Sequence, residues 1–429
     1  TAEKPGLSWR SDRRHDLRHR RSGCVKQPTK CRAKNAPGLI HSILTPLLGE
    51  SVMKTNGKGP ALLRLNNQKR VMAQLRKLRV TSRQDLAEAL TLSKNTVSLI
   101  IDDLLEQGLI EELGPVSVAA AGRPKIGITL RPEKLKSAGV MVERNVIHWR
   151  VCDYFSQVLA EATLRTDTSH PTRLLAELAM LCRELTERYP DLLGIGLGFP
   201  GIVDPRRGWM HISLPLEWQD VDLLTTLRKH VRLPIRIMNN VKAAALLAVE
   251  QSGLSPESGH FYLRISEGIG GALVQQGQVF TGHSWTAGEA GHLVVQPEGP
   301  RCSCGRRGCL EALVSKPAVN QQLAQRQPGL SWQNRDSAPR VVDEVMAQAG
   351  GYLGAALSQI MLLLNPATII IDCPWSASER FCKAVRDTAH GNALAFTAAH
   401  TQLHLPEHRI DPPNGPTLAG MGPSEPRVG

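Results

Sequence analysis

The sequence lacks a continuous run of about 18 apolar residues, the length that a helix needs to cross a bilayer. It also lacks the short apolar core of a secretory signal near its N-terminus. We therefore expect no membrane span and a cytoplasmic location. The nine cysteines are an odd number and are clustered rather than evenly spread. This pattern argues against a disulfide framework and favours a reducing compartment with a metal site.

Methionine is missing from the start of the chain, where Met53 is the first. Residues 1–35 carry eleven Lys or Arg against three Asp or Glu, so they account for +8 of the net charge of +13. Such a block is usually disordered and binds nucleic acid only weakly. We expect residues 1–60 to be a basic leader without fixed structure, and our hypothesis is that translation starts at Met53. The charge of this segment is therefore not evidence for a function.

Residues 61–130 have the pattern of a winged helix-turn-helix. Two helices joined by the turn "TLS" span residues 82–107, and a recognition helix reads DNA mainly through its N-terminal residues. A two-stranded wing follows, whose Gly-Arg-Pro tip offers a side chain to an A·T-rich minor groove. An ordinary helical hairpin with a polar face is the alternative. The residues expected to contact DNA are Ser82, Arg83, Ser93, Lys94, Asn95, Thr96, Ser98 and Arg123.

From about residue 131 strands alternate with helices, which is typical of an α/β fold. Three strands joined by tight turns come first, then a helix around 171–188 and the buried strand "LLGIGLGFPGIVD". The second half repeats this scheme with "IRIMNN", a helix over 241–251 and the strands of "HFYLRISEGIGGALVQQGQVF". A long apolar helix around 341–364 and the strand "TIIID" complete the pattern.

Three cysteines and a histidine are concentrated in "GHLVVQPEGPRCSCGRRGCLEA", residues 291–312. One imidazole and three thiolates form a closed tetrahedral set for Zn²⁺, with no position left for a catalytic water. Gly305 and Gly308 let the chain turn tightly between the ligands. A redox pair is the alternative, but C-x-C lacks the usual C-x-x-C spacing. The predicted ligands of this structural zinc site are His292, Cys302, Cys304 and Cys309.

Three stretches resemble the ROK family of repressors, open reading frames and sugar kinases: "GFPGIVD", "GEAGH" and "CSCGRRGCLEA". The third has the order C-x-C-G-x-x-G-C-x-E of the family signature. The resemblance covers roughly residues 66–410 and is greatest to the branch of transcriptional repressors. It implies a two-lobed actin-like (ribonuclease H-like) domain over 131–410, of the ATPase type, with a sugar between the lobes. It also implies five sugar-contacting residues: Asn239, Asn240, Glu289, His292 and Glu311.

The same family contains kinases, so the resemblance raises the question of phosphate transfer. Met141 stands where the kinases have the Asp of their first phosphate turn, and residues 143–145 replace Gly-Gly-Thr with side chains that block the backbone's approach to phosphate. Glu267 places a carboxylate in the second turn. Asn240 replaces the catalytic Asp, and an amide cannot take a proton near neutral pH. We therefore expect no catalytic residue and no enzyme activity.

The sequence thus predicts a winged helix-turn-helix followed by a two-lobed sugar-binding α/β domain. Residues 411–429 are rich in proline, so we expect an irregular end where related chains have a helix. The expected function is a sugar-responsive repressor of carbohydrate metabolism genes that binds a double-stranded DNA operator as a homodimer or tetramer. A sugar kinase with an attached DNA reader and a regulator that senses a protein partner are the alternatives. Glu289 and Glu311 have an alternative role as well, as ion-paired residues that only support the metal.

Overall fold

The structure is a computed structural model that describes residues 60–116, 125–255 and 257–406. The leader, the tip of the wing with Arg123 and the proline-rich end lie outside the described residues. The expectations about these three segments stay predictions.

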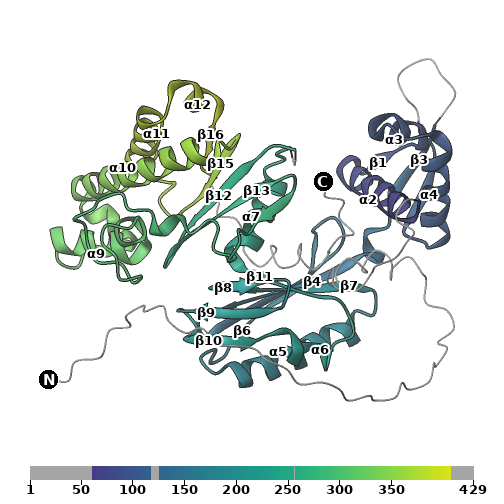
Figure 1. The fold of residues 1–429 in the computed structure, drawn as a ribbon, viewed down its shortest axis with the longest axis horizontal. Coiled ribbons are helices and arrows are strands. Elements are labelled where there is room, and N and C mark those ends of the chain that lie inside the picture. The colour runs from purple at the N-terminus through teal and green to yellow at the C-terminus, as the bar shows by residue number, and fades with distance from the viewer. Residues whose placement is uncertain (1–59, 117–124, 256, 407–429) are drawn as a thin grey trace, which may run out of the picture. The chain divides into compact units, whose positions relative to one another are not determined.

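Residues 60–116 and 125–130 form three helices and a small antiparallel sheet of order β1-β3-β2 (Figure 1). The Ser82 hydroxyl caps α3 by accepting the Asp85 amide at 3.2 Å. The same helix ends at Thr91, whose φ of 53° closes the turn into α4. The predicted helix-turn-helix and the strands of the wing are therefore present. Their bounds are α2 (Pro60–Leu78), β1 (Val80–Thr81), α3 (Arg83–Leu90), α4 (Lys94–Glu106), β2 (Ile110–Val116) and β3 (Lys125–Leu130).

The first lobe of the larger domain is built on a five-stranded sheet of order β11-β7-β4-β5-β6. Strands β4, β5 and β6 form the expected antiparallel meander, and β7 and β11 add in parallel. A second, three-stranded sheet (β8-β9-β10) was not predicted and extends from the end of β7. The bounds are β4 (Lys136–Glu143), β5 (Val146–Cys152), β6 (Val158–Arg165), α5 (Pro171–Arg188), β7 (Leu192–Phe199), β8 (Ile202–Asp204), β9 (Trp209–Ser213), β10 (Trp218–Asp222), α6 (Leu224–Arg228) and β11 (Ile235–Asn239).

The second lobe repeats the topology of the first, because its sheet has the order β14-β13-β12-β15-β16 with β15 and β16 parallel to β12. The antiparallel members β13 and β14 complete the same meander. This duplication confirms the two-lobed α/β architecture. The bounds are α7 (Asn240–Gln251), β12 (His260–Ile265), β13 (Ile269–Gln275), β14 (Gln278–Phe280), η3 (Ala290–His292), α8 (Glu311–Val314), α9 (Lys316–Arg326), α10 (Pro339–Leu364), β15 (Thr368–Asp372), α11 (Glu379–Asn392), α12 (Ala395–His400) and β16 (Gln402–His404).

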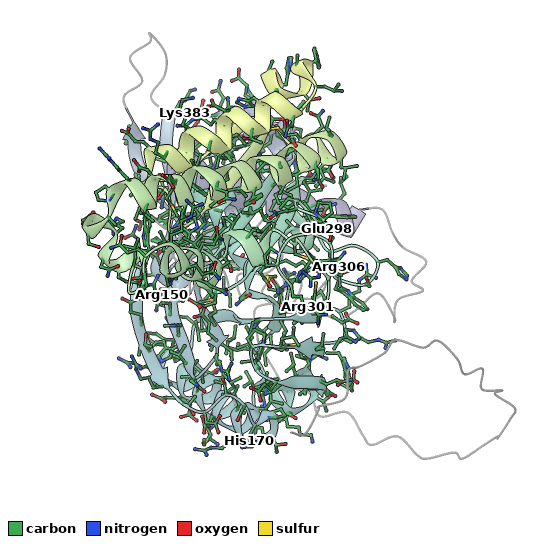
Figure 2. The ribbon with its side chains drawn as sticks, turned by 90° about the vertical axis from the view of Figure 1, so that its left-hand side faces the viewer. Arg150, His170, Glu298, Arg301, Arg306 and Lys383 are labelled. Carbon is green, nitrogen blue, oxygen red and sulfur yellow. The ribbon has the colours of Figure 1, made fainter. Side chains whose placement is uncertain are left out.

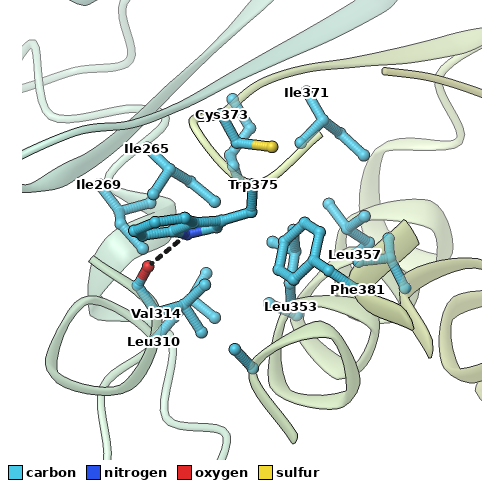
Figure 3. Close-up of a cluster of buried hydrophobic side chains, with 14 of the residues drawn as sticks. Ile265, Ile269, Leu310, Val314, Leu353, Leu357, Ile371, Cys373, Trp375 and Phe381 are labelled. Atoms are coloured by element: carbon cyan, nitrogen blue, oxygen red, sulfur yellow. Dashed lines mark hydrogen bonds between the residues drawn. The ribbon is translucent and has the colours of Figure 1, made fainter. Parts of the chain in front are cut away.

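The core of the second lobe surrounds Trp375, which is fully buried (Figure 3). Its indole N–H donates to the carbonyl of Val314 at 3.2 Å. This satisfies the polar end of the ring, which an apolar core would otherwise leave unpaired. The bond fixes the end of α8 and thereby the segment that begins with Glu311.

Helices α10 and α11 pack closely because glycines face the contact. A Cβ on Gly350 would lie 2.5 Å from the Phe381 carbonyl oxygen, and one on Gly354 would lie 2.6 Å from Thr388 Cβ. By length and composition alone α10 could also cross a membrane, and half of its most apolar stretch is buried inside the structure. A helix buried in a protein core can be as long and as apolar as a helix that spans a membrane. The prediction of no membrane span, based on the sequence, therefore stays a prediction.

Arg76, near the end of α2, contacts three residues of the first and second lobes. Its guanidinium donates to Ser156 Oγ at 2.9 Å, pairs with the Glu250 carboxylate and lies over the Tyr154 ring at 5.4 Å. Glu250 belongs to the last turn of α7, whose first residue is Asn240. The winged unit and α7 also share one hydrophobic cluster.

Candidate functional site

The four predicted metal ligands lie together, with all their ligand atoms within 4.8 Å of one another. Cys302 Sγ lies 3.6 Å from His292 Nδ1, and the sulfurs of Cys304 and Cys309 lie 3.7 Å apart. In a tetrahedral site with Zn–S bonds of about 2.3 Å, two sulfurs stand about 3.8 Å apart. The set could therefore hold a metal ion, and its cysteines are all free thiols.

The backbone of this metal knot, residues 292–309, depends on two glycines with positive φ, 88° at Gly305 and 69° at Gly308. Around them the Cys302 amide donates to the Arg306 carbonyl at 2.8 Å, and the Gly308 amide donates to the Pro300 carbonyl at 2.9 Å. A Cβ on Gly308 would lie 1.5 Å from the Gln296 carbonyl oxygen. Only glycine fits at position 308, whereas at Gly305 it is the positive φ that favours glycine.

Positive charge beside the knot favours thiolates. Burial by itself would raise the pKa of Cys304, but hydrogen bonds from the backbone and guanidinium of Arg306 lower it to about 6. Burial raises the pKa of Cys309 to about 12, so this thiol must lose its proton when a metal binds. Arg306 and Arg301 are labelled in Figure 2. The knot thus combines one thiol that ionises readily with another that the metal must deprotonate.

Glu311 ties the knot to the turn before β13. Its Oε2 accepts the Ile269 amide at 2.9 Å, and its Oε1 accepts the Ser303 hydroxyl at 3.2 Å. A Cβ on Gly268 would lie 2.7 Å from Oε2. Both oxygens therefore accept hydrogen bonds from protein groups. The donors are an amide and a hydroxyl, and not the cation that an ion-paired Glu311 would have. This geometry favours a supporting role for Glu311.

Glu289, by contrast, is exposed. Protein atoms that displace water raise the pKa of its carboxyl, and the charges of Lys242 and His292 oppose this rise. Water still reaches the side chain. Among the predicted sugar ligands, Glu289 is the carboxylate able to accept hydroxyl hydrogen bonds from a ligand.

The two asparagines at the start of α7 have different roles. Asn239 is the N-cap: its Oδ1 accepts the amides of Val241 at 2.8 Å and Lys242 at 3.1 Å, and its Nδ2 donates to the Gly201 carbonyl at 2.9 Å. Its acceptor is therefore consumed by the backbone. Asn240 is half-buried, and no hydrogen bond of its side chain is present among the described residues. Its amide remains able to meet a ligand.

Sequence reasoning did not identify Lys242, the third residue of α7. It is only 6% exposed, and its Nζ donates to the carbonyl of Trp285. The signal was present, since Lys242 is the only charged residue in the apolar run "VKAAALLAV". A buried lysine is rare unless it is paired.

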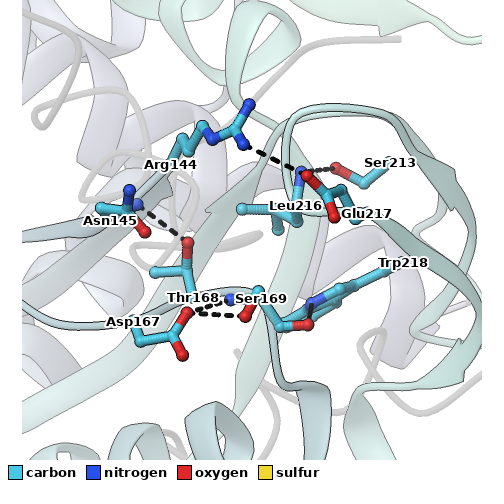
Figure 4. Close-up of polar contacts among 9 residues, drawn as sticks. All are labelled: Arg144, Asn145, Asp167, Thr168, Ser169, Ser213, Leu216, Glu217 and Trp218. Carbon is cyan, nitrogen blue, oxygen red and sulfur yellow. Dashed lines mark hydrogen bonds and ion pairs between the residues drawn. The ribbon is translucent and has the colours of Figure 1, made fainter.

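The phosphate turns of the kinases are filled by side chains in this structure. Arg144 pairs with Glu217 at 3.1 Å, and the Asn145 amide donates to Thr168 Oγ1 at 2.9 Å (Figure 4). Met141 is buried, and Glu267 is exposed and pairs with Lys316 at 3.4 Å. In the first turn, side chains stand where a nucleotide phosphate needs bare backbone. In the second turn the glycines Gly268 and Gly270 are present, but the Glu311 carboxylate lies against Gly268 and takes the Ile269 amide.

In the winged unit, the first turn of α4 presents polar groups. Ser93 caps the helix by accepting the Thr96 amide at 3.1 Å. Lys94 and Asn95 are exposed, and Ser98 lies one turn further along. The opposite face of α4 is buried. These side chains are placed where a recognition helix meets base edges and phosphates.

Two further residues predicted to contact DNA are engaged within the protein. Ser82 is buried and donates to Asp85 at 2.7 Å. Arg83 pairs with Asp102 at 2.7 Å and with Glu112 at 3.1 Å, and these partners raise its pKa against the effect of burial. Both residues hold α3 in place, and a contact of Arg83 with phosphate would require breaking its ion pairs.

A duplicated lobe topology preceded by a winged-helix unit places this chain among actin-like proteins with an added N-terminal unit. Residues 137–409 match the ROK family, and the chain belongs to this family. It is 26% identical over 313 residues to the xylose repressor of Bacillus subtilis, covering 71% of this chain and 81% of that protein. It is 26% identical over 350 residues to the Escherichia coli K12 DNA-binding transcriptional dual regulator NagC, covering 77% of this chain and 85% of NagC.

Solved structures share the fold. The crystal structure of a ROK family transcriptional regulator, a homologue of E. coli Mlc, aligns with a TM-score of 0.71 at 22% identity, over 84% of this chain and 98% of the other. The ROK hexokinase of Thermus thermophilus aligns with a TM-score of 0.58 at 24% identity, over 66% of this chain and 97% of the other. The hexokinase alignment covers less of this chain.

Proposed function

We propose that this protein is a sugar-responsive transcriptional regulator, a repressor of genes for carbohydrate metabolism. The observation that carries the proposal is the alignment with the xylose repressor and NagC over 71% and 77% of the chain. Both relatives are named as regulators, and NagC as DNA-binding. The proposal assigns DNA binding to residues 61–130, sugar binding to residues 131–410 and a cytoplasmic location to the whole.

The exposed first turn of α4 supports the DNA-binding part. Lys94 supplies a cation for phosphate, and Asn95 supplies an amide able to read a base edge. Arg123 at the tip of the wing is proposed to enter the minor groove. A homodimer or tetramer would bring two such helices to a palindromic operator.

The metal knot supports the sugar-binding part. We propose Zn²⁺ as its ion, because three thiolates and one imidazole fill a tetrahedral shell and leave no open position for chemistry. His292 lies three residues after Glu289, so the metal orders the loop that presents this carboxylate. Asn240 and Glu289 are the proposed sugar contacts, and Asn239, His292 and Glu311 position them.

Absence of phosphotransfer is part of the proposal. Side chains fill both phosphate turns, and Asn240 has no basicity to deprotonate a sugar hydroxyl. A coupled assay of ADP release with ATP and a panel of sugars is expected to give the rate of the no-enzyme control. Turnover of any sugar would contradict this part of the proposal.

The test of the main proposal starts with thermal unfolding of the zinc-loaded chain against xylose, N-acetylglucosamine, glucose and their phosphates. A ligand that binds the folded state raises the melting temperature by mass action. The sugar identified in this way is then added to operator DNA selected by the protein from a random pool. A changed operator affinity is expected; equal affinity with and without every sugar would overturn the proposal and favour a protein partner as the effector.

Two variants that each remove one lysine test whether α4 is the helix that reads DNA. Lys94→Ala is expected to weaken binding to all DNA sequences and to reduce the salt slope of the affinity by about 1, as loss of one phosphate contact does. Lys229→Ala removes an exposed lysine of the sugar-binding domain and is expected to change neither. An unchanged salt slope in Lys94→Ala would argue against α4 as the reading helix.

A further inference from the structure

Three residues outside the predicted site lie together beside Glu289. They are His211 on β9, Lys242 on α7 and Trp285, in the segment between β14 and η3. The Trp285 ring stacks on the His211 imidazole with a centroid distance of 5.2 Å and an interplanar angle of 17°. The Trp285 carbonyl accepts a hydrogen bond from Lys242 Nζ. One tryptophan is thus held by its ring from the first lobe and by its backbone from the second.

Lys242 is placed at a cost to stability. Its side chain is buried, although a buried ammonium loses its hydration. It also lies in the first turn of α7, where the helix dipole disfavours positive charge. Burial lowers its pKa, and the carboxylate of Glu289 opposes this. An apolar residue of similar volume would pack there at lower cost, and local violations of this kind concentrate at functional sites.

The backbone of Trp285 is strained as well. Its φ of 61° lies in the left-handed region, which is rare for a bulky residue. A strained conformation persists only where the surroundings over-determine it. The stack on His211 and the bond from Lys242 supply two such constraints. The third is Gly288, where a Cβ would lie 2.2 Å from the Gly271 carbonyl oxygen, so the chain passes close against β13 just before Glu289.

His211 has an unsatisfied polar atom. Its Nε2 is buried and has no hydrogen-bond partner in the part of the chain that the structure describes. Such atoms call for a partner that the protein does not provide. The position of this nitrogen next to the Trp285 ring is consistent with a partner that arrives with the ligand.

We infer that Lys242 is a positioning residue of the proposed sugar site: together with His211 it fixes Trp285, and so it holds the loop 281–289 that presents Glu289 to a bound sugar. The inference rests on the proposed function for its ligand. Glu289 is then constrained from both sides along the chain, by Lys242 at Trp285 before it and by the metal at His292 after it. Loss of either constraint would leave Glu289 without a defined position.

The test compares Lys242→Met, which keeps the length of the side chain but removes its charge and donor, with Lys383→Met as the matched control. Lys383 is exposed on α11 and lies away from Arg306 in Figure 2. The probes are D-xylose and N-acetyl-D-glucosamine, titrated into zinc-loaded full-length chain by calorimetry. We expect Lys242→Met to bind the active sugar at least tenfold more weakly, with unchanged zinc content, and the control to match the wild type. Affinity within twofold of the wild type would overturn the inference.

Hydrogen exchange gives a second readout that needs no sugar. In Lys242→Met we expect the amides of residues 281–289 to exchange at least tenfold faster, while those of the metal knot do not change. If neither sugar binds the wild type, the proposed ligand is wrong. The positioning role is tested independently, because unchanged exchange in this loop of Lys242→Met would overturn it whether or not a sugar binds. If Lys242→Met does not fold, His211→Ala replaces it and is expected to speed exchange in the same loop. His211→Phe, which keeps a stacked ring, is expected to lie closer to the wild type; equal effects of the two His211 variants would refute the role of the stack.

Discussion

The two glycines of the metal knot allow a sharp prediction, because they have similar backbone conformations but different surroundings. Gly305 has a φ of 88° with no atom within 4 Å of a built Cβ. Gly308 has a φ of 69°, and its Cβ would lie 1.5 Å from the Gln296 carbonyl oxygen. Alanine at either position must adopt a left-handed conformation, at a cost of about 1–2 kcal/mol. Only at Gly308 must the backbone also move.

The magnitudes follow from these contacts. For Gly305→Ala we expect zinc affinity to fall roughly tenfold, since about 1.4 kcal/mol corresponds to one decade. In Gly308→Ala the clash separates Gln296 from Gly308 and strains the bonds that Gly308 forms with Val295 and Pro300, both 2.9 Å long. Each buried bond left unmade costs about 1–3 kcal/mol. For two such bonds we therefore expect a further loss of at least about thirtyfold in zinc affinity.

The assay is competition for zinc with a chromophoric chelator, together with metal content measured after dialysis. Circular dichroism of each variant checks that the α/β domain remains folded. Zinc bound equally well by Gly308→Ala and Gly305→Ala would refute the argument, because it would mean that the tight approach of Gln296 does not shape the ligand set. Equal and complete loss in both would mean that φ alone is decisive.

Three further predictions concern the proposed DNA-reading unit and the proposed sugar site. Ser93→Ala removes the cap of the Thr96 amide, which costs about 1 kcal/mol, so we expect operator affinity measured by fluorescence anisotropy to fall up to about fivefold; an unchanged affinity would contradict this. The hydrogen bond from Lys125 lowers the pKa of Asp85, so the pair stabilises the wing above the ordinary Asp range and this stabilisation is lost as the pH falls. The melting temperature of wild type should therefore drop toward that of Asp85→Asn as the pH falls from about 5 to about 2, and a constant difference over this range would count against the pair. Asn240→Asp restores a carboxylate but leaves the phosphate turns filled, so we expect no ADP release above wild type; measurable release would show that the filled turns do not block the nucleotide.

Much of the fold could be predicted from periodicity and turn chemistry. The helix over 171–188 and the strand "TIIID" appear as Pro171–Arg188 and Thr368–Asp372. The small sheet β8-β9-β10 was missed because its strands are short and Ile212 on β9 is exposed although it is apolar. Short strands without a continuous apolar face carry little periodic signal.

For the site, motif spacing was sufficient to group the metal ligands, since all four come from one short segment. It could not separate the roles of Asn239 and Asn240, because a capping bond depends on where the helix begins. It also missed the partnership of His211 with Trp285, two residues brought together only by the packing of separate elements. Spacing predicts local chemistry well, whereas contacts between distant elements require the folded chain.

The contacts of Arg76 have a consequence for protein engineering. When DNA-binding domains are exchanged between regulators, the winged unit is assumed to be independent of the rest of the chain, so that it can be replaced by a cut at residue 130. In this chain such a cut would separate Arg76 from Ser156 and Glu250 and would leave the Tyr154 ring without its cation. A functional chimera should therefore take residues 153–156 and the end of α7 from the same parent as the reading head. A functional chimera thus depends on preserving the contacts between the two units, and not only on where the linking peptide is cut.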